Sequence, residues 1–441
     1  MNALLTMLRT RRAAATSAER GPERPIVVLI SALLGFESAM YSAVTPVLPH
    51  YAHVLHAAKP AVGVLTAAYP AGIVPGSLLG AWIAHRAGVR RTSLIGLLLF
   101  AASIAAFGFG TDIVTLDTLR FVQGTGCGFI WGGGLTWVIA VAPRERRGAV
   151  LGSVFAAAIF GTLLGPVLGT LAVTIGTRPV FLVVGVVSLA LAVWTLRHDE
   201  PAPWTTGPET DTPLRAAMRS RRMRLGSWLI LLEAATIGAT GTLLPLRLAR
   251  FGASGVMIGA TFLVASLVST LVAGPIGRTV DRRGAGLLLC VGLTLTAVLM
   301  ALLPLPQTAV LLAIVSVIAL GGPLTAYTIP AMAMITDAAE QAGIPLAVAT
   351  MLLNLAWAVG ETIGAPAAAN LSQATSDAVP LLLLSAIMVV TLWPVIRARL
   401  NAASTEPAEP VGVPPAQPPA TERRPPRRAR DDSERIPTAI R

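Results

Sequence analysis

Long apolar runs constrain the fold of this 441-residue chain more than any other feature. A membrane-spanning helix needs about 20 mainly apolar residues, and about twelve such runs follow one another here. Because 54% of the residues are hydrophobic and only 13% are charged, a soluble protein could not cover so much apolar surface. We therefore predict an all-α polytopic membrane protein. The expected spans are 26–48, 61–83, 92–111, 116–141, 148–173, 178–196, 225–247, 256–276, 285–304, 307–334, 344–371 and 378–397.

Positive charge is concentrated on alternate connections between these runs. The formal net charge is +12, and arginines crowd the N-terminal arm, the turns at 85–91, 144–147, 215–224 and 278–283, and the tail after Arg397. The other connections carry few cations: Lys59, Arg178, Arg247 and Arg250. This is the positive-inside pattern, so we expect both termini in the cytoplasm and the protein in the inner membrane. The same placement disfavours a nucleic-acid partner and allows the basic tail to contact anionic lipid.

An internal repeat appears when the chain is shifted by 196 residues. The shift aligns Glu37 with Glu233, Pro49 with Pro245, Gly63 with Gly259, Arg86 with Arg282, and Gly88 with Gly284. It predicts two parallel, pseudo-symmetric halves of six helices, and such halves typically surround a midplane binding site. The expected organisation is a cytoplasmic arm at 1–25, a first half at 26–197, a cytoplasmic loop at 198–224, a second half at 225–398 and a disordered tail at 399–441.

Residues that commonly bind metals or form disulfides are few. Cys127 and Cys290 lie within apolar spans, where we expect core packing. The histidines His50, His53 and His56 have a spacing that a metal site could use, but no cysteine or carboxylate lies near them. We expect no metal, no cofactor and no enzymatic activity, since no nucleophile, metal or phosphate-loop motif is convincing.

Several short motifs occur in an order that resembles the major facilitator superfamily. "GRTVDRRG" is similar to its cytoplasmic loop motif, "RFVQGTG" to its fourth-helix motif, and "GTLLGPVLGT" to its fifth-helix antiporter motif. "TPVLP" and "NLAWAVGETIGAP" resemble its drug-exporter branch. Across 25–398 the resemblance implies the twelve-helix fold of that superfamily, and specifically its drug:proton antiporter group.

The resemblance assigns roles to two groups of residues. The loop-motif residues, implied to act in gating, are His85, Arg86, Gly88, Gly277, Asp281, Arg282 and Gly284. The fifth-helix residues, implied to form a tight seam with helix eight that limits leak, are Gly161, Gly165, Pro166 and Gly169. Three positions depart from the motifs: Thr170 replaces a frequent glycine, Ala81 replaces the first glycine of the loop motif, and His85 replaces the aspartate that is implied to latch the halves. We therefore expect a weaker latch in the first half, with Asp281 carrying more of it.

Ionisable residues inside the apolar runs are the strongest functional signal, because a buried charge in a membrane is costly and usually faces a cavity or a partner. The expected cavity and proton-coupling residues are Glu37, Tyr41, Arg120, Glu233, Asn354, Trp357 and Glu361. Glu37 lies roughly 16 Å into the first helix, near the midplane, and is the favoured proton or cation site. The superfamily resemblance gives Arg120 a part in proton coupling. Alternatives remain: Glu361 reaching headgroup water, or a purely structural pair of Arg120 with Glu37 or Glu233.

The main functional hypothesis is a monomeric exporter that uses proton entry to drive out a small amphiphilic compound. When deprotonated, a membrane carboxylate can bind a cationic amphiphile, so protons and cargo compete for it. A nutrient importer of the same fold is the second hypothesis. A non-transporting membrane sensor or scaffold is the third.

Overall fold

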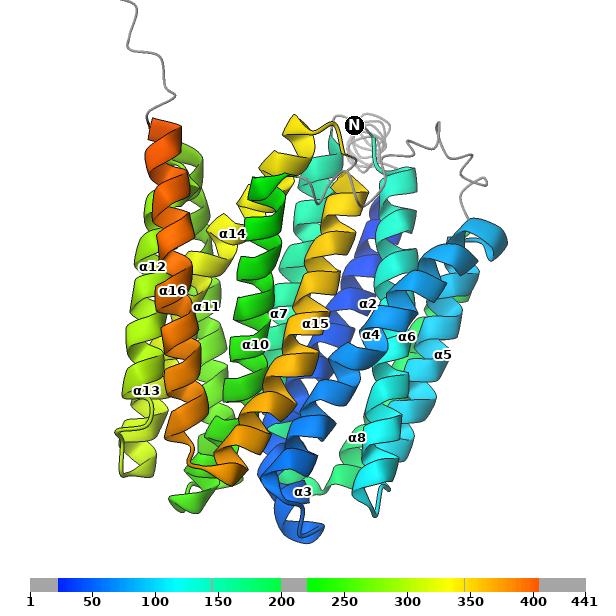
Figure 1. Ribbon diagram of the computed structural model, residues 1–441. Helices are drawn as coiled ribbons and strands as arrows, with labels where there is room; N and C mark the ends of the chain where they lie inside the picture. The colour runs from blue at the N-terminus through cyan, green and yellow to red at the C-terminus, as the bar shows by residue number, and fades with distance from the viewer. Residues whose placement is uncertain (1–22, 144–145, 200–219, 345, 404–441) are drawn as a thin grey trace, which may run out of the picture. The chain divides into compact units, whose positions relative to one another are not determined.

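The computed structural model describes residues 23–143, 146–199, 220–344 and 346–403, and these contain helices and no strand. The predicted arm, central loop and tail lie mostly outside these ranges. In the first half the elements are α2 (Arg24–Ala43), η1 (Thr45–Val47), α3 (Leu48–Val54), α4 (Lys59–Ala87), α5 (Val89–Phe107), α6 (Ile113–Val141), α7 (Arg147–Ile175) and α8 (Thr177–Leu196). In the second half they are α10 (Arg221–Arg250), α11 (Gly255–Arg283), α12 (Ala285–Leu302), α13 (Ala309–Gly321), α14 (Pro323–Gln341), α15 (Leu346–Ala374) and α16 (Ala378–Ala403) (Figure 1).

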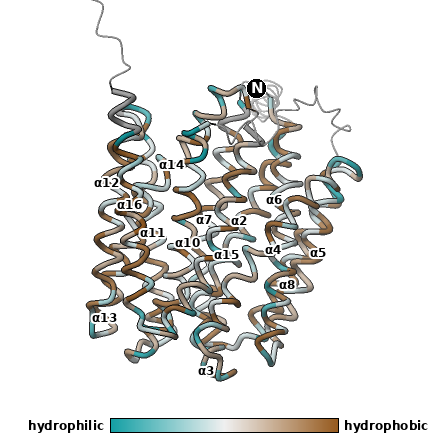
Figure 2. The backbone as a smooth tube through the Cα atoms, in the orientation of Figure 1, coloured by the Kyte–Doolittle hydropathy of each residue, from teal (hydrophilic) through white to brown (hydrophobic). Residues whose placement is uncertain are grey.

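Every predicted span corresponds to helix. Eleven segments of the described residues are long and apolar enough to cross a membrane. α15 is as long as α4 but carries Asn354, Trp357 and Glu361, and it is not among the eleven. Hydrophobic residues dominate the middle of the helices and hydrophilic ones gather near their ends (Figure 2). The all-α membrane fold class is therefore confirmed.

Two predicted helices are interrupted. Pro46 lies in the 3-10 turn η1, which separates α2 from α3. The tenth span divides at Gly322 into α13 and α14, and Pro323 begins α14, where its missing N–H is not needed. Proline in a helix interior removes a backbone hydrogen bond. Both helices are therefore interrupted next to a proline, at Pro46 and at Pro323.

The 196-residue repeat is visible in the backbone. α4 and α11 have the same length and end at Gly88 and Gly284, whose φ angles of 93° and 76° favour glycine. Tyr51 donates a hydrogen bond to the carbonyl of Phe107, and Arg247 donates one to the carbonyl of Leu303. These two bonds are related by the same shift, so the two halves share a detailed architecture as well as a helix order.

Two close helix pairs join the halves. α4 lies beside α15, where a side chain on Gly63 would collide with Ala369 and with backbone atoms of Ala365 and Pro366 (Figure 1). α11 lies beside α7, where a side chain on Gly259 would collide with Thr170. Gly63 and Gly259 are repeat mates, so the two seams are pseudo-equivalent. We call the face where α2 begins the N-terminal face, and the other the opposite face.

Candidate functional site

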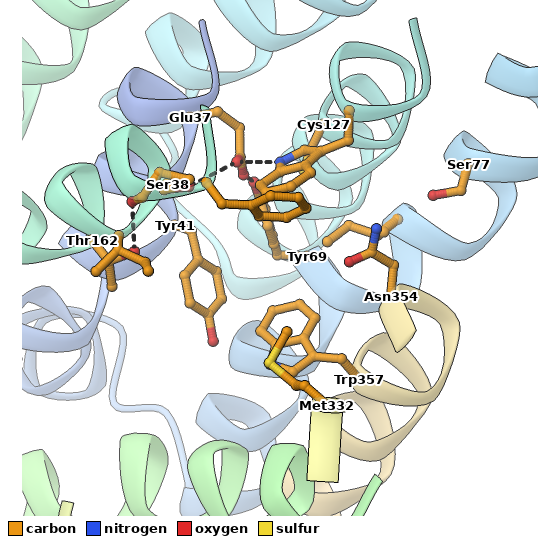
Figure 3. A pocket seen from close by; sticks show the side chains of 15 residues that line it. Glu37, Ser38, Tyr41, Tyr69, Ser77, Cys127, Thr162, Met332, Asn354 and Trp357 are labelled. Carbon is orange, nitrogen blue, oxygen red and sulfur yellow. Dashed lines mark hydrogen bonds between the residues drawn. The ribbon is translucent and has the colours of Figure 1, made fainter. Parts of the chain in front are cut away.

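A cavity of about 280 Å³ lies between the two halves (Figure 3). Its wall combines one carboxylate with aromatic, thiol and small polar side chains from α2, α4, α6, α7, α14 and α15. The lining residues are Glu37, Ser38, Tyr41, Tyr69, Ile73, Ser77, Cys127, Trp131, Phe155, Ala158, Ile159, Thr162, Met332, Asn354 and Trp357. Of the residues expected from the sequence, Glu37, Tyr41, Asn354 and Trp357 meet here.

Glu37 is 3% exposed and is held by three donors. Trp131 Nε1 donates to Oε2 over 2.7 Å, the hydroxyl of Ser38 donates more weakly to the same oxygen over 3.4 Å, and the hydroxyl of Tyr69 donates to Oε1. A carboxylate accepts hydrogen bonds at both oxygens. Both oxygens of Glu37 are therefore hydrogen-bonded at the cavity wall.

Arg120 does not line the cavity; it lies behind the ring of Tyr69, which does. Its guanidinium carbon is 4.4 Å from the centre of the Tyr69 ring, and its Nη1 donates to Gln123 Oε1 over 2.7 Å. No ion pair with Arg120 is present in the described part of the chain. A direct structural pair with Glu37 or Glu233 is therefore absent from these ranges. Tyr69 connects Arg120 and Glu37 instead.

Glu361 also lies behind the cavity wall. It is 2% exposed near the middle of α15, so the alternative that it reaches headgroup water at a helix end is wrong. The hydroxyl of Tyr41 donates to Glu361 Oε1 over 2.7 Å. The Tyr41 ring packs against Trp357, with 5.3 Å between ring centres. Tyr41 therefore connects the cavity to the Glu361 carboxyl.

Glu233 is buried on α10 but does not line the cavity. Thr328 of α14 lies near it, and the hydroxyl of Thr328 donates to the carbonyl of Leu324. The hydroxyls of Thr236 and Thr240, on the same helix as Glu233, donate to carbonyls of that helix. The role of Glu233 in proton coupling stays a prediction.

A second chamber of about 330 Å³ shares Ile73, Ser77, Trp131, Phe155 and Asn354 with the first. It continues toward the ends of the helices at the N-terminal face, and its further lining residues there include Ala81, Ile139, Leu151 and Thr350. Most of this wall is apolar. The space between the halves therefore extends from Glu37 toward the N-terminal face.

The glycines of the fifth-helix motif face a different partner from the one expected. Side chains on Gly161, Gly165 and Gly169 would overlap the backbone of α2, at Gly35, Ala39 and Ala43. The prediction that these glycines form the seam with the eighth helix, α11, is therefore wrong. The residues of α7 that approach the glycines of α11 are Pro166, Thr170 and Val173. Of the assigned motif residues, only Pro166 is among them. The spacing of four marks a close-approach face but does not identify the neighbouring helix.

The loop-motif residues lie at the N-terminal face. His85, Arg86, Asp281 and Arg282 are exposed, and Arg86 stacks on Trp82 at 4.3 Å. Gly88 and Gly284 adopt positive φ, whereas a side chain on Gly277 would meet open space. Neither His85 nor Asp281 forms an ion pair within the described ranges. The relative strength of the two latches stays a prediction.

With this geometry described, comparison with known proteins decides the family. The model of the Major Facilitator Superfamily matches residues 29–361. The chain belongs to this superfamily. Its relatives include the "Uncharacterized MFS-type transporter YcaD" of Escherichia coli and of Shigella flexneri, each 27% identical over 377 residues, which are 85% of this chain and 96% of the relative.

Solved transporters of this superfamily share the fold. The crystal structure of a D-xylose-proton symporter superposes with a TM-score of 0.67 at 16% identity, covering 84% of this chain and 95% of the symporter. The nucleoside transporter NupG gives 0.66 at 14% identity, covering 84% and 98%. The protein is therefore a multi-pass MFS transporter, and these distant structures establish its fold.

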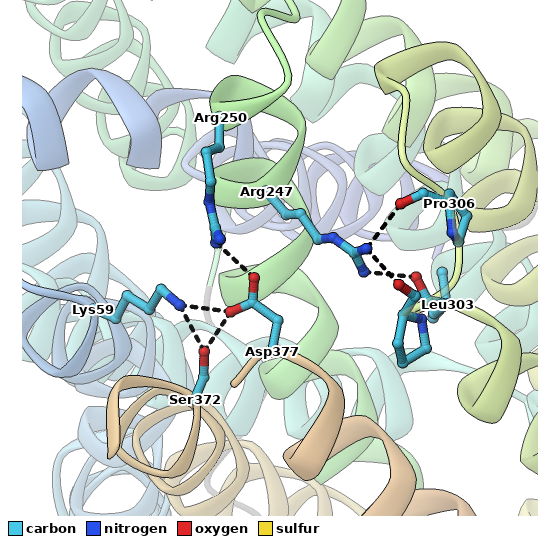
Figure 4. Close-up of polar contacts among 8 residues, drawn as sticks. Lys59, Arg247, Arg250, Leu303, Pro306, Ser372 and Asp377 are labelled. Carbon is cyan, nitrogen blue, oxygen red and sulfur yellow. Dashed lines mark hydrogen bonds and ion pairs between the residues drawn. The ribbon is translucent and has the colours of Figure 1, made fainter. Parts of the chain in front are cut away.

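A polar cluster at the opposite face was not predicted from the sequence (Figure 4). Asp377, between α15 and α16, binds Lys59 at 2.6 Å and Arg250 at 2.5 Å, and Ser372 also donates to it. Burial alone would raise the pKa of Asp377, but hydrogen bonds from Lys59 and Ser372, with the charges of Lys59 and Arg250, lower it below its usual range. Since Lys59 begins α4, the cluster joins the two halves of this MFS transporter.

Tyr69 and Trp131 were also missed. Both lie in apolar runs, where an aromatic residue usually signals packing, although the hydroxyl and indole N–H of buried Tyr and Trp usually need a partner. The signal that points to them is their ability to donate a hydrogen bond to the carboxylate of Glu37. Asp377 and Lys59 lie in connections far apart in the sequence, and no local pattern links them.

Proposed function

We propose that this MFS transporter is a proton-coupled exporter of small amphiphilic compounds with a cationic group. The observation that carries the proposal is the single carboxylate of Glu37 in a cavity wall otherwise made largely of aromatic and apolar side chains. A cation in the cavity pairs with Glu37, while Tyr41 and Trp357 present ring surfaces for cation–π contact. Its apolar portion fits the second chamber, which is lined mainly by apolar residues.

Competition between protons and cargo supplies the coupling. A carboxyl that exchanges its proton when access changes sides can release cargo on protonation and bind it again on deprotonation. Uptake of protons down their gradient then drives cargo outward by alternating access. The active unit in this scheme is a monomer in the inner membrane, with protons, the small molecule and lipid as its partners.

The state seen here fits one stage of this cycle. The halves are joined at the opposite face by the Asp377 cluster and by the seams at Gly63 and Gly259, and the chambers extend toward the N-terminal face. Positive charge on the N-terminal connections supports placing that face in the cytoplasm. In that orientation the cavity is ready to receive cargo from the cytoplasm or the inner leaflet.

A sugar or another polyhydroxylated nutrient is less well matched. Four of the polar groups that line the cavity, on Glu37, Tyr41, Tyr69 and Trp131, are engaged with other protein groups. In the described part of the chain, Ser77, Thr136 and Asn354 line these chambers without a hydrogen bond to another protein group. Three such groups are few for a ligand with many hydroxyls, since buried unpaired polar groups are costly. The cavity thus favours an amphiphile over the importer alternative.

Reconstitution in vesicles tests the proposal. Purified full-length protein, an imposed pH gradient and a fluorescent cationic amphiphile are used, and net dye movement is measured with the gradient in either direction. We expect gradient-driven dye transport that falls by about tenfold or more in Glu37→Gln, because the counter-charge is lost. Glu340→Gln, which changes an exposed carboxylate at the end of α14, is the matched control. Dye movement independent of the gradient, or full activity in Glu37→Gln, contradicts the proposal.

A further inference from the structure

A partly buried side-chain hydrogen bond crosses between the halves near the middle of the helices. Tyr41 on α2 donates to Glu361 Oε1 on α15 over 2.7 Å. The second oxygen of Glu361, Oε2, has no hydrogen-bond partner in the described part of the protein. An ionised carboxylate held in this way would leave much of its charge unsatisfied in a dry environment, at a cost of several kcal/mol. A neutral carboxylic acid avoids most of that cost.

Glu37 and Glu361 therefore have contrasting environments. Glu37 accepts from three donors at the cavity wall, whereas Glu361 accepts one bond and lies behind that wall. Two carboxyls whose surroundings favour different protonation states divide the roles of counter-charge and acid. This contrast assigns the counter-charge to Glu37 and leaves Glu361 for the proton.

We propose that Glu361 holds the exchanged proton and that Tyr41 couples this proton to cargo in the cavity and to the relative movement of the two halves. The inference rests on the proposed function of proton-coupled transport. Tyr41 is suited to this positioning role because its ring lines the cavity, 5.3 Å from the Trp357 ring and 5.5 Å from the Tyr69 ring. Cargo that packs among these rings displaces Tyr41, so that water from the cavity reaches Glu361 in place of the hydroxyl and stabilises its carboxylate by further hydrogen bonds. The carboxyl O–H bond then breaks, and the proton passes to that water.

The other charged groups around Glu361 are compatible with this exchange. Arg120 of α6 and Glu233 of α10 act on it through their charges, and Tyr41 of α2 donates a hydrogen bond to it. α4 and α14 also pack on α15, but their buried tyrosines are engaged elsewhere: Tyr69 donates to Glu37 and Tyr327 to the carbonyl of Leu229. Arg120 is thus the cation that offsets the carboxylate during the deprotonated stage, and Tyr41 is the donor that senses cargo.

The vesicle assay separates this role from cargo binding. Glu361→Gln keeps the shape of the side chain and removes its titration. We expect dye accumulation driven by the pH gradient, and proton release on adding dye, to fall by about tenfold or more. Exchange of labelled for unlabelled dye at equal pH on both sides stays within about twofold of the wild type. In Glu37→Gln both accumulation and exchange are lost, because the dye no longer binds. Glu340→Gln again serves as the control.

Tyr41→Phe tests the positioning role, because it keeps the ring and removes only the hydroxyl. The hydroxyl stabilises the Glu361 carboxylate by donating to it. Its removal is therefore expected to move the pH profile of transport upward by about one unit, which corresponds to about 1.4 kcal/mol. Proton-driven accumulation that persists in Glu361→Gln overturns the inference. If that variant does not fold, an unchanged pH profile in Tyr41→Phe overturns it instead. A wild type without gradient-driven transport contradicts the proposed function itself, and with it the premise of this inference.

Discussion

At the scale of single residues, Tyr69 organises the charged centre of the first half. Its hydroxyl donates to Glu37, and its ring lies under the guanidinium of Arg120. Tyr69 thereby holds a carboxylate and a cation near each other without an ion pair between them. A cavity carboxylate fixed in this way remains available to a cationic ligand, whereas one paired with arginine would not.

Substituting Tyr69 by phenylalanine tests this arrangement. Tyr69→Phe keeps the ring under Arg120 and removes one donor from Glu37. A hydrogen bond to a charged group contributes about 1.5–3 kcal/mol, so we expect the affinity for a cationic dye to fall by about tenfold, measured by fluorescence titration in detergent. Tyr327→Phe removes a buried hydroxyl that donates to Leu229 and does not line the cavity, so it should leave dye affinity unchanged. Equal affinity losses in both variants would contradict the role of Tyr69.

At the scale of helices, α7 and α15 pack in the same manner on the first helix of their own half. Gly161 and Gly165 approach the backbone of α2, and Gly360 and Gly364 approach α10 at Leu231 and Ala235. The proline after each pair, Pro166 or Pro366, faces the other half instead. Each helix thus has one fixed face and one face that meets the other half, which suits rigid-body movement of the halves.

Substitution at Gly161 measures how closely α7 and α2 approach. The new Cβ of Gly161→Ala would overlap the carbonyl of Gly35, so we expect the free energy of unfolding to fall by about 1–3 kcal/mol, seen as a lower melting temperature in detergent. Gly152→Ala, on the same helix, places its Cβ where no heavy atom lies within 4 Å. That control should leave stability unchanged or raise it by up to about 1 kcal/mol, the gain in helix propensity of alanine over glycine. A melting temperature for Gly161→Ala equal to that of Gly152→Ala would show that the helices can separate at little cost.

The sequence predicts these helices better than their contacts, and the reason is physical. Hydropathy is a local property, so the apolar runs locate all the spans, and the repeat of Gly88 at Gly284 gives the symmetry of the halves. Contacts are set by tertiary packing, which the spacing of Gly161 and Gly165 cannot reveal. The same limit hid Tyr69, Trp131 and Asp377. Glu37 and Glu361 were predictable because charge inside a membrane span is conspicuous on its own.

At the scale of the whole transporter, the Asp377 cluster closes the opposite face. Lys59 from the first half and Arg250 from the second both bind the same carboxylate. For the space near Glu37 to become accessible from that face, the bond between Lys59 and Asp377 must break. Because the lowered pKa of Asp377 keeps it ionised above its ordinary value of 3.8, this closure is retained at neutral pH and is lost only as the pH falls through that lowered value. The cluster therefore does not titrate near neutral pH.

Neutralising Asp377 should shift the protein toward opening at the opposite face. Cys127 lines the cavity, so it reports access when Cys290 is replaced by serine and an impermeant thiol reagent is added from one side of the membrane. We expect Asp377→Asn to raise labelling of Cys127 from the opposite face by about fivefold, as a loss of about 1 kcal/mol from the closed state requires. The ratio of labelling in Asp377→Asn to labelling in the wild type should be the same at about pH 5 and pH 8, since Asp377 is ionised at both and the effect of pH on the thiol cancels in the ratio. Asp112→Asn is the matched control: Asp112 caps α6 at the same face, bonded to Thr115 within its own half, and asparagine caps helices equally well. Labelling that rises equally in both variants, or in neither, would show that Asp377 does not hold the halves together.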